Sequence, residues 1–130
     1  MKKNDLTPEQ YDVLVNHATE RPFSGEYDDH YSKGTYVCGW CNAPLYNSES
    51  KFDAGCGWPA FDDEIPGAVK RVLDPDGIRT EIRCNHCDGH LGHEFKGEYL
   101  TPKNVRACVN SLALKFIPDG QPLPPVADEV

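Results

Sequence analysis

The stretch that decides the fold is Thr35-Tyr36-Val37-Cys38-Gly39-Trp40-Cys41-Asn42-Ala43-Pro44-Leu45-Tyr46. Its two ends, Thr35-Tyr36-Val37 and Pro44-Leu45-Tyr46, are short apolar runs, and a tight CxxC turn joins them. The same order returns at Cys84-Asn85-His86-Cys87, which precedes the apolar run from Leu91 to Phe95. A strand, a CxxC turn and a returning strand therefore occur twice, which predicts two hairpins.

Four of the six cysteines lie in these two turns, 46 positions apart when counted from Cys38 to Cys84. In such a turn both sulfurs can face one tetrahedral ion. A redox-active CxxC usually opens a helix after a strand, and neither pair does so here. We therefore predict one structural Zn²⁺ per chain; iron is an alternative metal and His86 an alternative ligand. The predicted zinc ligands are Cys38, Cys41, Cys84 and Cys87.

The composition fits one domain over residues 1–130, made mainly of small antiparallel sheets. Eleven glycines and eleven prolines suit short strands joined by tight turns. The net charge of −8 argues against a general nucleic-acid-binding protein, because phosphate backbones are held by basic surfaces. No run approaches membrane-spanning length and no secretory h-region is visible, so we expect no membrane partner. A cytoplasmic, reducing location and a monomer are the default expectations.

Local signals predict the other elements. Leu6-Thr7-Pro8-Glu9-Gln10-Tyr11 is a helix start, in which Thr7 and Gln10 form a capping box and Leu6 and Tyr11 a hydrophobic staple. The Tyr11 side then continues, so the short helix is expected to end near residue 17 or 18. Further expected strands are Lys51–Asp53, Val69–Leu73, Ile78–Arg83 after the turn Asp74–Gly77, and Arg106–Ile117, the longest candidate.

Two segments are expected to lie outside the main strands. Trp58-Pro59-Ala60-Phe61 is apolar but carries a proline, which indicates a loop or an edge strand. The tail from 118 to 130 holds four prolines and several acids, which is typical of a mobile segment.

Cys56 and Cys108 are left after the clustered cysteines are assigned. Cys108 stands two residues before Asn110, and on a regular strand both would share a face with the apolar stripe from Leu112 to Phe116. Taken alone, Cys108 is more simply a buried structural cysteine, because a free thiol packs as a small hydrophobe. Cys56 lies between two glycines in an expected loop, where an exposed thiol suits a resolving partner.

His90 and His93 flank Gly92 at the start of an expected strand. In a regular strand they would face opposite sides, and ordinary strand histidines are the simpler interpretation. A bulge, which the glycine permits, would turn both inward. Trp58 could form an apolar wall for a ligand or could simply pack as a large aromatic.

Two charged residues near these positions have plain alternatives. Glu81 shares a strand face with Arg79 and Arg83, so a surface ion-pair ladder is its simplest interpretation. Arg106 could lower the pKa of Cys108, although a solvated charge at a strand end is the commoner case.

In this order the motifs resemble the methionine-R-sulfoxide reductase (MsrB) family over nearly the whole chain. The resemblance implies a β-tent of small antiparallel sheets with the zinc distant from the active site. The sequence departs from the family's pattern at Ala107, where tyrosine is common, and in the loop Lys96–Pro102. The motifs that carry the resemblance are Leu6–Tyr11, Phe23–Tyr27, Gly34–Cys38 with Cys41, Lys51–Asp53, Cys56–Phe61, Glu81–Cys84 with Cys87, Gly89–His93 and Cys108–Ser111.

The resemblance also implies the chemistry. Methionine-R-sulfoxide, free or in proteins, would be reduced by Cys108 as nucleophile, and the choice of the R epimer rests on the resemblance alone. Cys56 would resolve the sulfenic acid as a disulfide, with thioredoxin as the reductant. His93, with His90 and a water, is the expected proton donor. The other expected site residues are Asn110 and Glu81 for catalysis and Trp58 and Phe61 for substrate binding.

Two other functions fit part of the sequence. A non-catalytic zinc-knuckle module that binds a ligand or a protein would use the four-cysteine site but neither Cys56 nor Cys108. A general thiol-disulfide oxidoreductase would use both of these cysteines but would leave Trp58 and the two histidines without a role.

Overall fold

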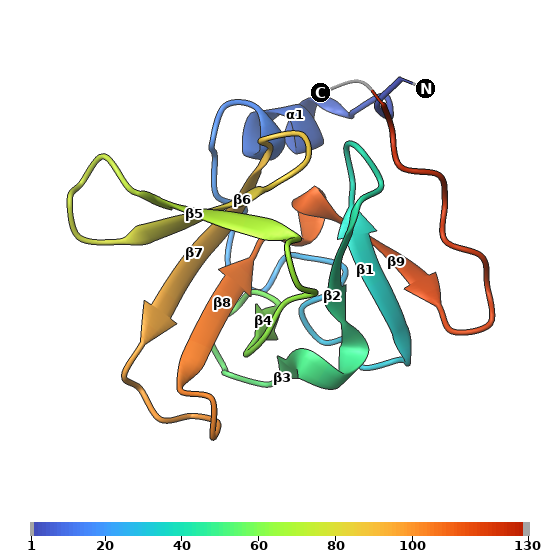
Figure 1. The fold of residues 1–130 in the computed structure, drawn as a ribbon. Coiled ribbons are helices and arrows are strands. Elements are labelled where there is room, and N and C mark those ends of the chain that lie inside the picture. Colours follow the sequence, from blue (N-terminus) through green and yellow to red (C-terminus); the bar gives the residue numbers. More distant parts are fainter. Residues whose placement is uncertain (1, 129–130) are drawn as a thin grey trace.

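The computed structural model describes residues 2–128, which form one short helix and nine strands of two sheets (Figure 1). Two single 3₁₀ turns, Ser48–Ser50 and Ser111–Ala113, interrupt them. No helix among residues 2–128 has the length and apolar character needed to cross a membrane. The main elements are α1 (Pro8–Leu14), β1 (Gly34–Cys38), β2 (Pro44–Asn47), β3 (Lys51–Phe52), β4 (Ala60–Phe61), β5 (Val69–Leu73), β6 (Thr80–Cys84), β7 (His90–Lys96), β8 (Val105–Val109) and β9 (Leu114–Pro118).

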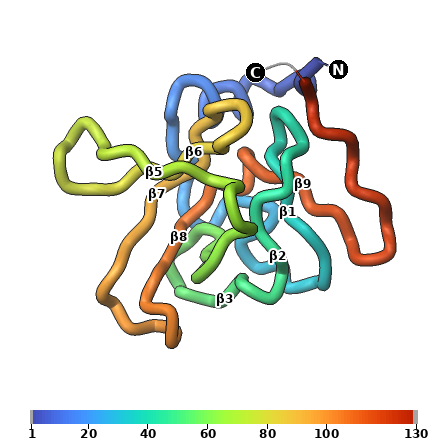
Figure 2. Tube along the Cα trace, viewed as in Figure 1, coloured from blue at the N-terminus to red at the C-terminus, as the bar shows by residue number. Residues whose placement is uncertain are grey.

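Both sheets are antiparallel, as the sequence predicts. The smaller sheet has the strand order β2-β1-β9, and the larger has the order β3-β4-β8-β7-β6-β5. In Figures 1 and 2 the strands β7 and β8 slope away on one side and β1 and β9 on the other, so the sheets lean apart like the sides of a tent. The predicted CxxC hairpins are confirmed, because one turn joins β1 to β2 and the other joins β6 to β7.

An aromatic cluster fills the space between the sheets. The rings of Tyr46 and Phe61 stack with centroids 4.2 Å apart, and Tyr36 meets Phe61 edge-on at 5.3 Å. All three side chains are at most 1% exposed. Aromatic pairs in these geometries add to the free energy gained by burial alone. Phe61 therefore lies in the core and not at a substrate pocket, where we had expected it.

The segment 106–117 is not one strand, which corrects the prediction. β8 ends at Val109 and a 3₁₀ turn redirects the chain, so that β9 joins the other sheet. Side chains from a distant segment fix this turn: the Ser111 hydroxyl accepts from the Tyr27 N–H at 3.1 Å, and the Glu20 carboxylate accepts from the Leu112 N–H at 3.0 Å. An alternating apolar pattern cannot reveal such contacts.

Two smaller predictions are also corrected. Ala60 and Phe61 form β4, which pairs with β3 on one side and β8 on the other, so this is an internal strand. The helix has the predicted capping box between Thr7 and Gln10, but it ends at Leu14. Its buried residues are Val13 and Leu14, whereas Tyr11 is 48% exposed and does not belong to the buried face.

Residues near both ends of the described chain bond to the first CxxC turn. The Asn4 N–H donates to the Trp40 carbonyl at 2.7 Å, and the Ala127 N–H donates to the Cys41 carbonyl at 2.8 Å. Ala127 is 2% exposed, and its carbonyl oxygen contacts the ring of His86 in the second CxxC turn. The tail at Ala127, within the segment for which the sequence predicts mobility, is thus packed against both turns, and residues 129 and 130 of that segment lie outside the described residues.

A bulge in β7 sets the direction of the two histidines. Gly92 lies opposite Ile82 and His90 lies opposite Arg83, so Leu91 is one residue extra on β7. The bulge turns His90 and His93 to the same side, as proposed from Gly92. Their rings meet edge-on with centroids 5.5 Å apart.

Gly92 is also a point of close approach between β7 and β8. A Cβ atom at this position would overlap the carbonyl oxygen of Cys108, which is backbone and cannot move aside. We therefore expect Gly92→Ala to lower the free energy of unfolding in urea by about 1–3 kcal/mol. Lys96→Ala, on an exposed position of the same strand, is the control and should change it by no more than about 0.5 kcal/mol. Equal effects of the two substitutions would contradict this account.

Candidate active site

Two free cysteines from different elements meet at the larger sheet. Cys56 lies in the loop between β3 and β4, and Cys108 lies in β8, where it is opposite Ala60. Their sulfurs are 3.1 Å apart, beyond the disulfide bond length of about 2.05 Å, so both are thiols in hydrogen-bond contact. Cys108 is 8% exposed, whereas Cys56 is only partly buried. A small movement would allow the two to form a disulfide.

Arg106 lies against the Cys108 sulfur. Its Nη1 donates to Sγ at 2.8 Å, and its guanidinium stacks on the Phe95 ring at 4.3 Å. Glu98 accepts two hydrogen bonds from the same guanidinium, at 2.6 and 3.0 Å. The Arg106 charge is therefore fixed in place beside the thiol. The plainer interpretation, a solvated charge at a strand end, does not apply to this side chain, which is 16% exposed.

The two thiols ionise as a pair. The hydrogen bond from the Cys108 thiol, together with a backbone hydrogen bond of Trp58 and the Arg106 charge, outweighs burial and lowers the pKa of Cys56 to about 6. The hydrogen bond with Cys56, burial and the negative charge of the Cys56 thiolate then raise the pKa of Cys108. Nη1 of Arg106 touches the Cys108 sulfur, and its charge opposes this rise in the pKa of Cys108.

Four of the expected catalytic and substrate-binding residues, Trp58, His93, Cys108 and Asn110, line one cavity of about 210 Å³. Cys108 forms part of its wall, and the ring of Trp58 supplies an apolar surface. The Trp58 Nε1–H donates to the Glu20 carbonyl at 3.0 Å, which fixes the plane of the ring. The residues that line the cavity are Thr19, Trp58, Arg79, Gly92, His93, Phe95, Arg106, Cys108 and Asn110.

His93 reaches this cavity from β7. Its Nε2 is 2.9 Å from a carboxylate oxygen of Asp74, in the turn between β5 and β6. Asp74 in turn lies 3.6 Å from the Arg79 guanidinium. Hydrogen bonding to His93 lowers the pKa of Asp74, which therefore remains charged and orients the imidazole.

Glu81 holds His90 from behind. It is 1% exposed, and one of its oxygens lies 2.6 Å from Nδ1 of His90 and 3.0 Å from Nδ1 of His17. The other oxygen accepts from Arg83 at 3.0 Å. Burial alone would raise the pKa of Glu81, but the hydrogen bonds from Arg83 and His90 outweigh it and lower the pKa to about 2. The expected surface ion-pair ladder is wrong, because this carboxylate is buried.

His90 is buried beside this carboxylate. Desolvation lowers the pKa of His90, and the hydrogen bond to Glu81 opposes that effect. Its Nε2 has no hydrogen-bond partner among residues 2–128. Ligand atoms of His17, Glu81 and His90 also lie close enough together for a metal ion. Here, however, hydrogen bonds and the Arg83 charge already satisfy the carboxylate.

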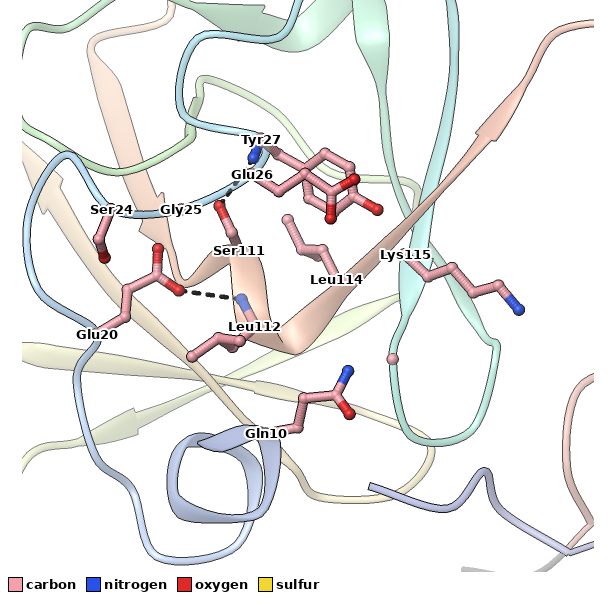
Figure 3. Close-up of a pocket in the computed structure, with 11 residues that line it drawn as sticks. Gln10, Glu20, Ser24, Gly25, Glu26, Tyr27, Ser111, Leu112, Leu114 and Lys115 are labelled. Carbon is pink, nitrogen blue, oxygen red and sulfur yellow. Dashed lines mark hydrogen bonds between the residues drawn. The ribbon is translucent and has the colours of Figure 1, made fainter. Parts of the chain in front are cut away.

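Asn110 and Trp58 are both attached to Glu20, a residue that the sequence did not single out. The Glu20 N–H donates to the Asn110 side chain at 2.9 Å, and the Asn110 amide donates to the Leu91 carbonyl at 2.9 Å. Figure 3 shows the Glu20 carboxylate bonded to the Leu112 N–H, at the edge of a second cavity of about 420 Å³. That cavity contains neither Cys56 nor Cys108. Glu20 therefore supports the site through its backbone and anchors itself through its side chain.

No local signal could have identified Glu20, because its partners are up to 92 positions away. His17 also lies against Glu81, and its side chain is 43% exposed. Asp74 was read only as a turn residue.

The other four cysteines form a separate cluster at the two CxxC turns. Their sulfurs lie within 4.8 Å of one another, and two of the contacts are 3.6 Å. A tetrahedral ion with bonds of about 2.3 Å would separate sulfurs by about 3.8 Å, close to what is observed. All four side chains are buried, and the cluster can hold a metal ion. Its members are Cys38, Cys41, Cys84 and Cys87.

Fold and site together define a small β domain with a close cysteine pair at a cavity and a separate four-cysteine cluster. The family model described as SelR domain matches residues 6–118. A relative named peptide methionine sulfoxide reductase B5 of Arabidopsis thaliana is 54% identical over 114 residues, 87% of this chain and 82% of the relative. The B5 protein of Oryza sativa subsp. japonica is also 54% identical, over 84% of its length. The chain belongs to the SelR-domain (MsrB) family.

Some relatives are longer than this chain. The chloroplastic peptide methionine sulfoxide reductase B2 of Arabidopsis thaliana is 54% identical over 119 residues, and the match covers 91% of this chain but 59% of the relative. The family membership confirms the resemblance stated from the sequence.

Glu81→Gln tests the buried network. We expect it to lower the free energy of unfolding by about 2 kcal/mol near pH 7, because Arg83 loses its buried carboxylate.

The pH dependence of stability follows from the shifted pKa values of His90 and Glu81. The lowered pKa of His90 means that stability decreases as pH falls below 6.5, where the unfolded imidazole takes up a proton. The lowered pKa of Glu81 means that a further loss follows between 4.5 and about 2.

Urea unfolding at a series of pH values measures both effects. In Glu81→Gln the loss below pH 4.5 should become smaller. Glu49→Gln, which changes an exposed glutamate, is the control and should leave both stability and its pH dependence unchanged. If Glu81→Gln lost as much stability below pH 4.5 as the wild-type protein does, the lowered pKa of Glu81 would not be the cause of that loss.

Proposed function

We propose that this chain is a peptide-methionine (R)-S-oxide reductase. The single observation that carries the proposal is the pair of sulfurs 3.1 Å apart, Cys56 and Cys108, of which Cys108 lines a cavity together with His93 and Trp58. Family membership and the printed names of the relatives support the same activity. The preference for the R epimer comes from the family resemblance.

The arrangement suggests how the reaction would proceed. The Cys108 thiolate, stabilised by Arg106, attacks the sulfoxide sulfur, while the oxygen takes a proton from the His93 side of the cavity. Trp58 forms the wall against the S-methyl group. The S–O bond breaks as two electrons pass from Cys108 to the substrate, methionine leaves, and Cys108 keeps the oxygen as a sulfenic acid.

Cys56 completes the cycle. Its thiolate attacks the sulfenic sulfur of Cys108, a disulfide forms, and water leaves with the oxygen. The contact of 3.1 Å between the two sulfurs means that little movement is needed. A dithiol protein, which we propose to be thioredoxin, then reduces the disulfide by exchange. Asn110 keeps the Cys108 strand end in register with the β7 bulge, and His90 with Glu81 supports His93 from behind.

The four-cysteine cluster would hold Zn²⁺ in a structural role. A set of four thiolates in two CxxC turns is the usual ligand set of a closed, tetrahedral zinc site. Iron is the alternative for the same ligands. We also propose that the chain works as a monomer in the cytoplasm, where reduced thiols persist.

Turnover of separated methionine sulfoxide epimers tests the function. The wild-type protein with thioredoxin should reduce the R epimer and leave the S epimer unchanged. Cys108→Ser should lose at least about a thousandfold in rate, because it removes the nucleophile. When thioredoxin is the reductant, Cys56→Ser should release one equivalent of methionine and then stop, because no disulfide can form.

The same assay separates the other functions. If neither epimer is consumed while the metal is fully bound, a non-catalytic zinc-knuckle binding module is the better description. If peroxide but not methionine sulfoxide produces the disulfide between Cys56 and Cys108, a general thiol-disulfide oxidoreductase is the better description.

Metal removal tests the cluster. We expect about one zinc per chain by elemental analysis, and Cys84→Ser should abolish it. Loss of the ion should lower the thermal midpoint by at least about 10 °C, because binding free energy is folding free energy at such a site. Cys56→Ser, outside the cluster, is the control and should retain the zinc and the midpoint. A metal-free wild-type protein of unchanged stability would contradict the proposal.

A further inference from the structure

Only one of the two reactive sulfurs is open to a large partner. Cys108 is 8% exposed within β8, and the Arg106 guanidinium covers its sulfur. Cys56 is more exposed and lies in a loop where Gly55 and Gly57 take left-handed backbone conformations, at φ +67° and +93°. A protein that reduces the disulfide must therefore come from the side of Cys56.

The surroundings of Cys56 form a distinct surface. Phe23 is 72% exposed and is fixed to the same loop, because its N–H donates to the Gly57 carbonyl at 2.7 Å. Tyr31 is 50% exposed, and a hollow of about 280 Å³ lies between the two aromatic rings and the loop. We call this surface the Cys56 face; it comprises Phe23, Tyr31, Asp28, Asp29 and Asp53.

The charge of the Cys56 face is negative. Its three carboxylates lie near the Tyr31 hydroxyl, and after burial they are the main reason that the pKa of Tyr31 is raised. Lys51, which contacts Tyr31, is 8% exposed and is turned inward, with its Nζ on the Tyr31 ring at 4.0 Å and bonded to the Asp28 carbonyl. The face thus presents two exposed aromatic rings with an acidic rim.

We propose that a thioredoxin-class dithiol protein docks on the Cys56 face and attacks the Cys56 sulfur rather than that of Cys108. This rests on the proposed reductase function and names the partner's contact surface. The partner that fits has an apolar surface around its reactive thiol, to cover Phe23 and Tyr31. It has basic side chains at the edge, to meet the three acids.

The direction of the exchange follows from Arg106. The reductant's thiolate attacks Sγ of Cys56, and a new disulfide forms between the two proteins as the Cys56–Cys108 bond breaks. The electron pair goes to Cys108, which leaves as a thiolate beside the Arg106 guanidinium; the better stabilised thiolate is the better leaving group. The reductant's second thiol then attacks its own sulfur in the mixed disulfide. Cys56 takes the proton of that second thiol and is released as a thiol, and the reductant leaves as a disulfide.

Trapping identifies the sulfur that is attacked. The wild-type protein is oxidised to its disulfide with methionine-R-sulfoxide and mixed with thioredoxin whose second active-site cysteine is replaced by serine. After an acid quench and digestion, mass spectrometry locates the mixed disulfide. We expect it on the peptide that contains Cys56. A mixed disulfide mainly on Cys108 would overturn the proposal.

Surface variants test the docking face. Phe23→Ser with Tyr31→Ser should raise the KM for thioredoxin at least about tenfold, as expected for the loss of two central aromatic contacts. Turnover supported by dithiothreitol should not change, because a small dithiol needs no docking surface. Tyr11→Ser, at a comparably exposed tyrosine on α1, is the matched control and should leave both activities unchanged.

The acidic rim has its own test. Asp28→Asn with Asp29→Asn should raise the KM for thioredoxin and weaken its dependence on salt, since screened attraction between charges is removed. If dithiothreitol supports reduction of the R epimer but no surface variant changes the KM for thioredoxin, the docking proposal fails and the reductase function stands. If dithiothreitol supports no reduction of either epimer, it is the proposed function that fails.

Discussion

The four-cysteine cluster joins turns that belong to different sheets. One turn closes the β1–β2 hairpin of the three-stranded sheet, and the other closes the β6–β7 hairpin of the six-stranded sheet. Strands as short as β3 and β4, with two residues each, add little stability of their own. A bound ion at the two CxxC turns would add free energy by tying one sheet to the other. Asn4 and Ala127 add main-chain hydrogen bonds at the first turn, so both ends of the described chain depend on the same point.

β8 is the second organising element, because it lies between β4 and β7. Register alone places Cys108 opposite Ala60 on one side and His93 on the other. The missing side chain of Gly92 allows this close approach, and the bulge beside it turns His90 to the same side as His93. The remaining side chains are held by a segment far away in sequence, since Glu20 bonds to both Asn110 and Trp58.

The sequence was informative wherever the chemistry is local. Two CxxC turns, a capping box at Thr7 and Gln10, and alternating strand patterns each need only a few neighbouring residues, and the structure contains them all. It was misleading where distant contacts decide. The 3₁₀ turn that separates β8 from β9 depends on partners 84 and 92 positions away, and Phe61 is in the core because the other sheet packs over it. Resemblance to a family can identify such residues, but it does not show which contacts position them.

The four clustered cysteines lie apart from Cys56 and Cys108, and this separation has a chemical consequence. The clustered cysteines are at most 6% exposed, and Ala127 contacts both turns that carry them, whereas Cys56 is partly exposed in a glycine-flanked loop. A chain that repeatedly makes and breaks a disulfide risks scrambling, in which the wrong thiol intercepts the oxidised sulfur. Here the six thiols are divided into an insulated set and a reactive set. In the proposed reaction, oxidation and reduction would then involve one pair of cysteines and leave the sulfurs of the two CxxC turns unchanged.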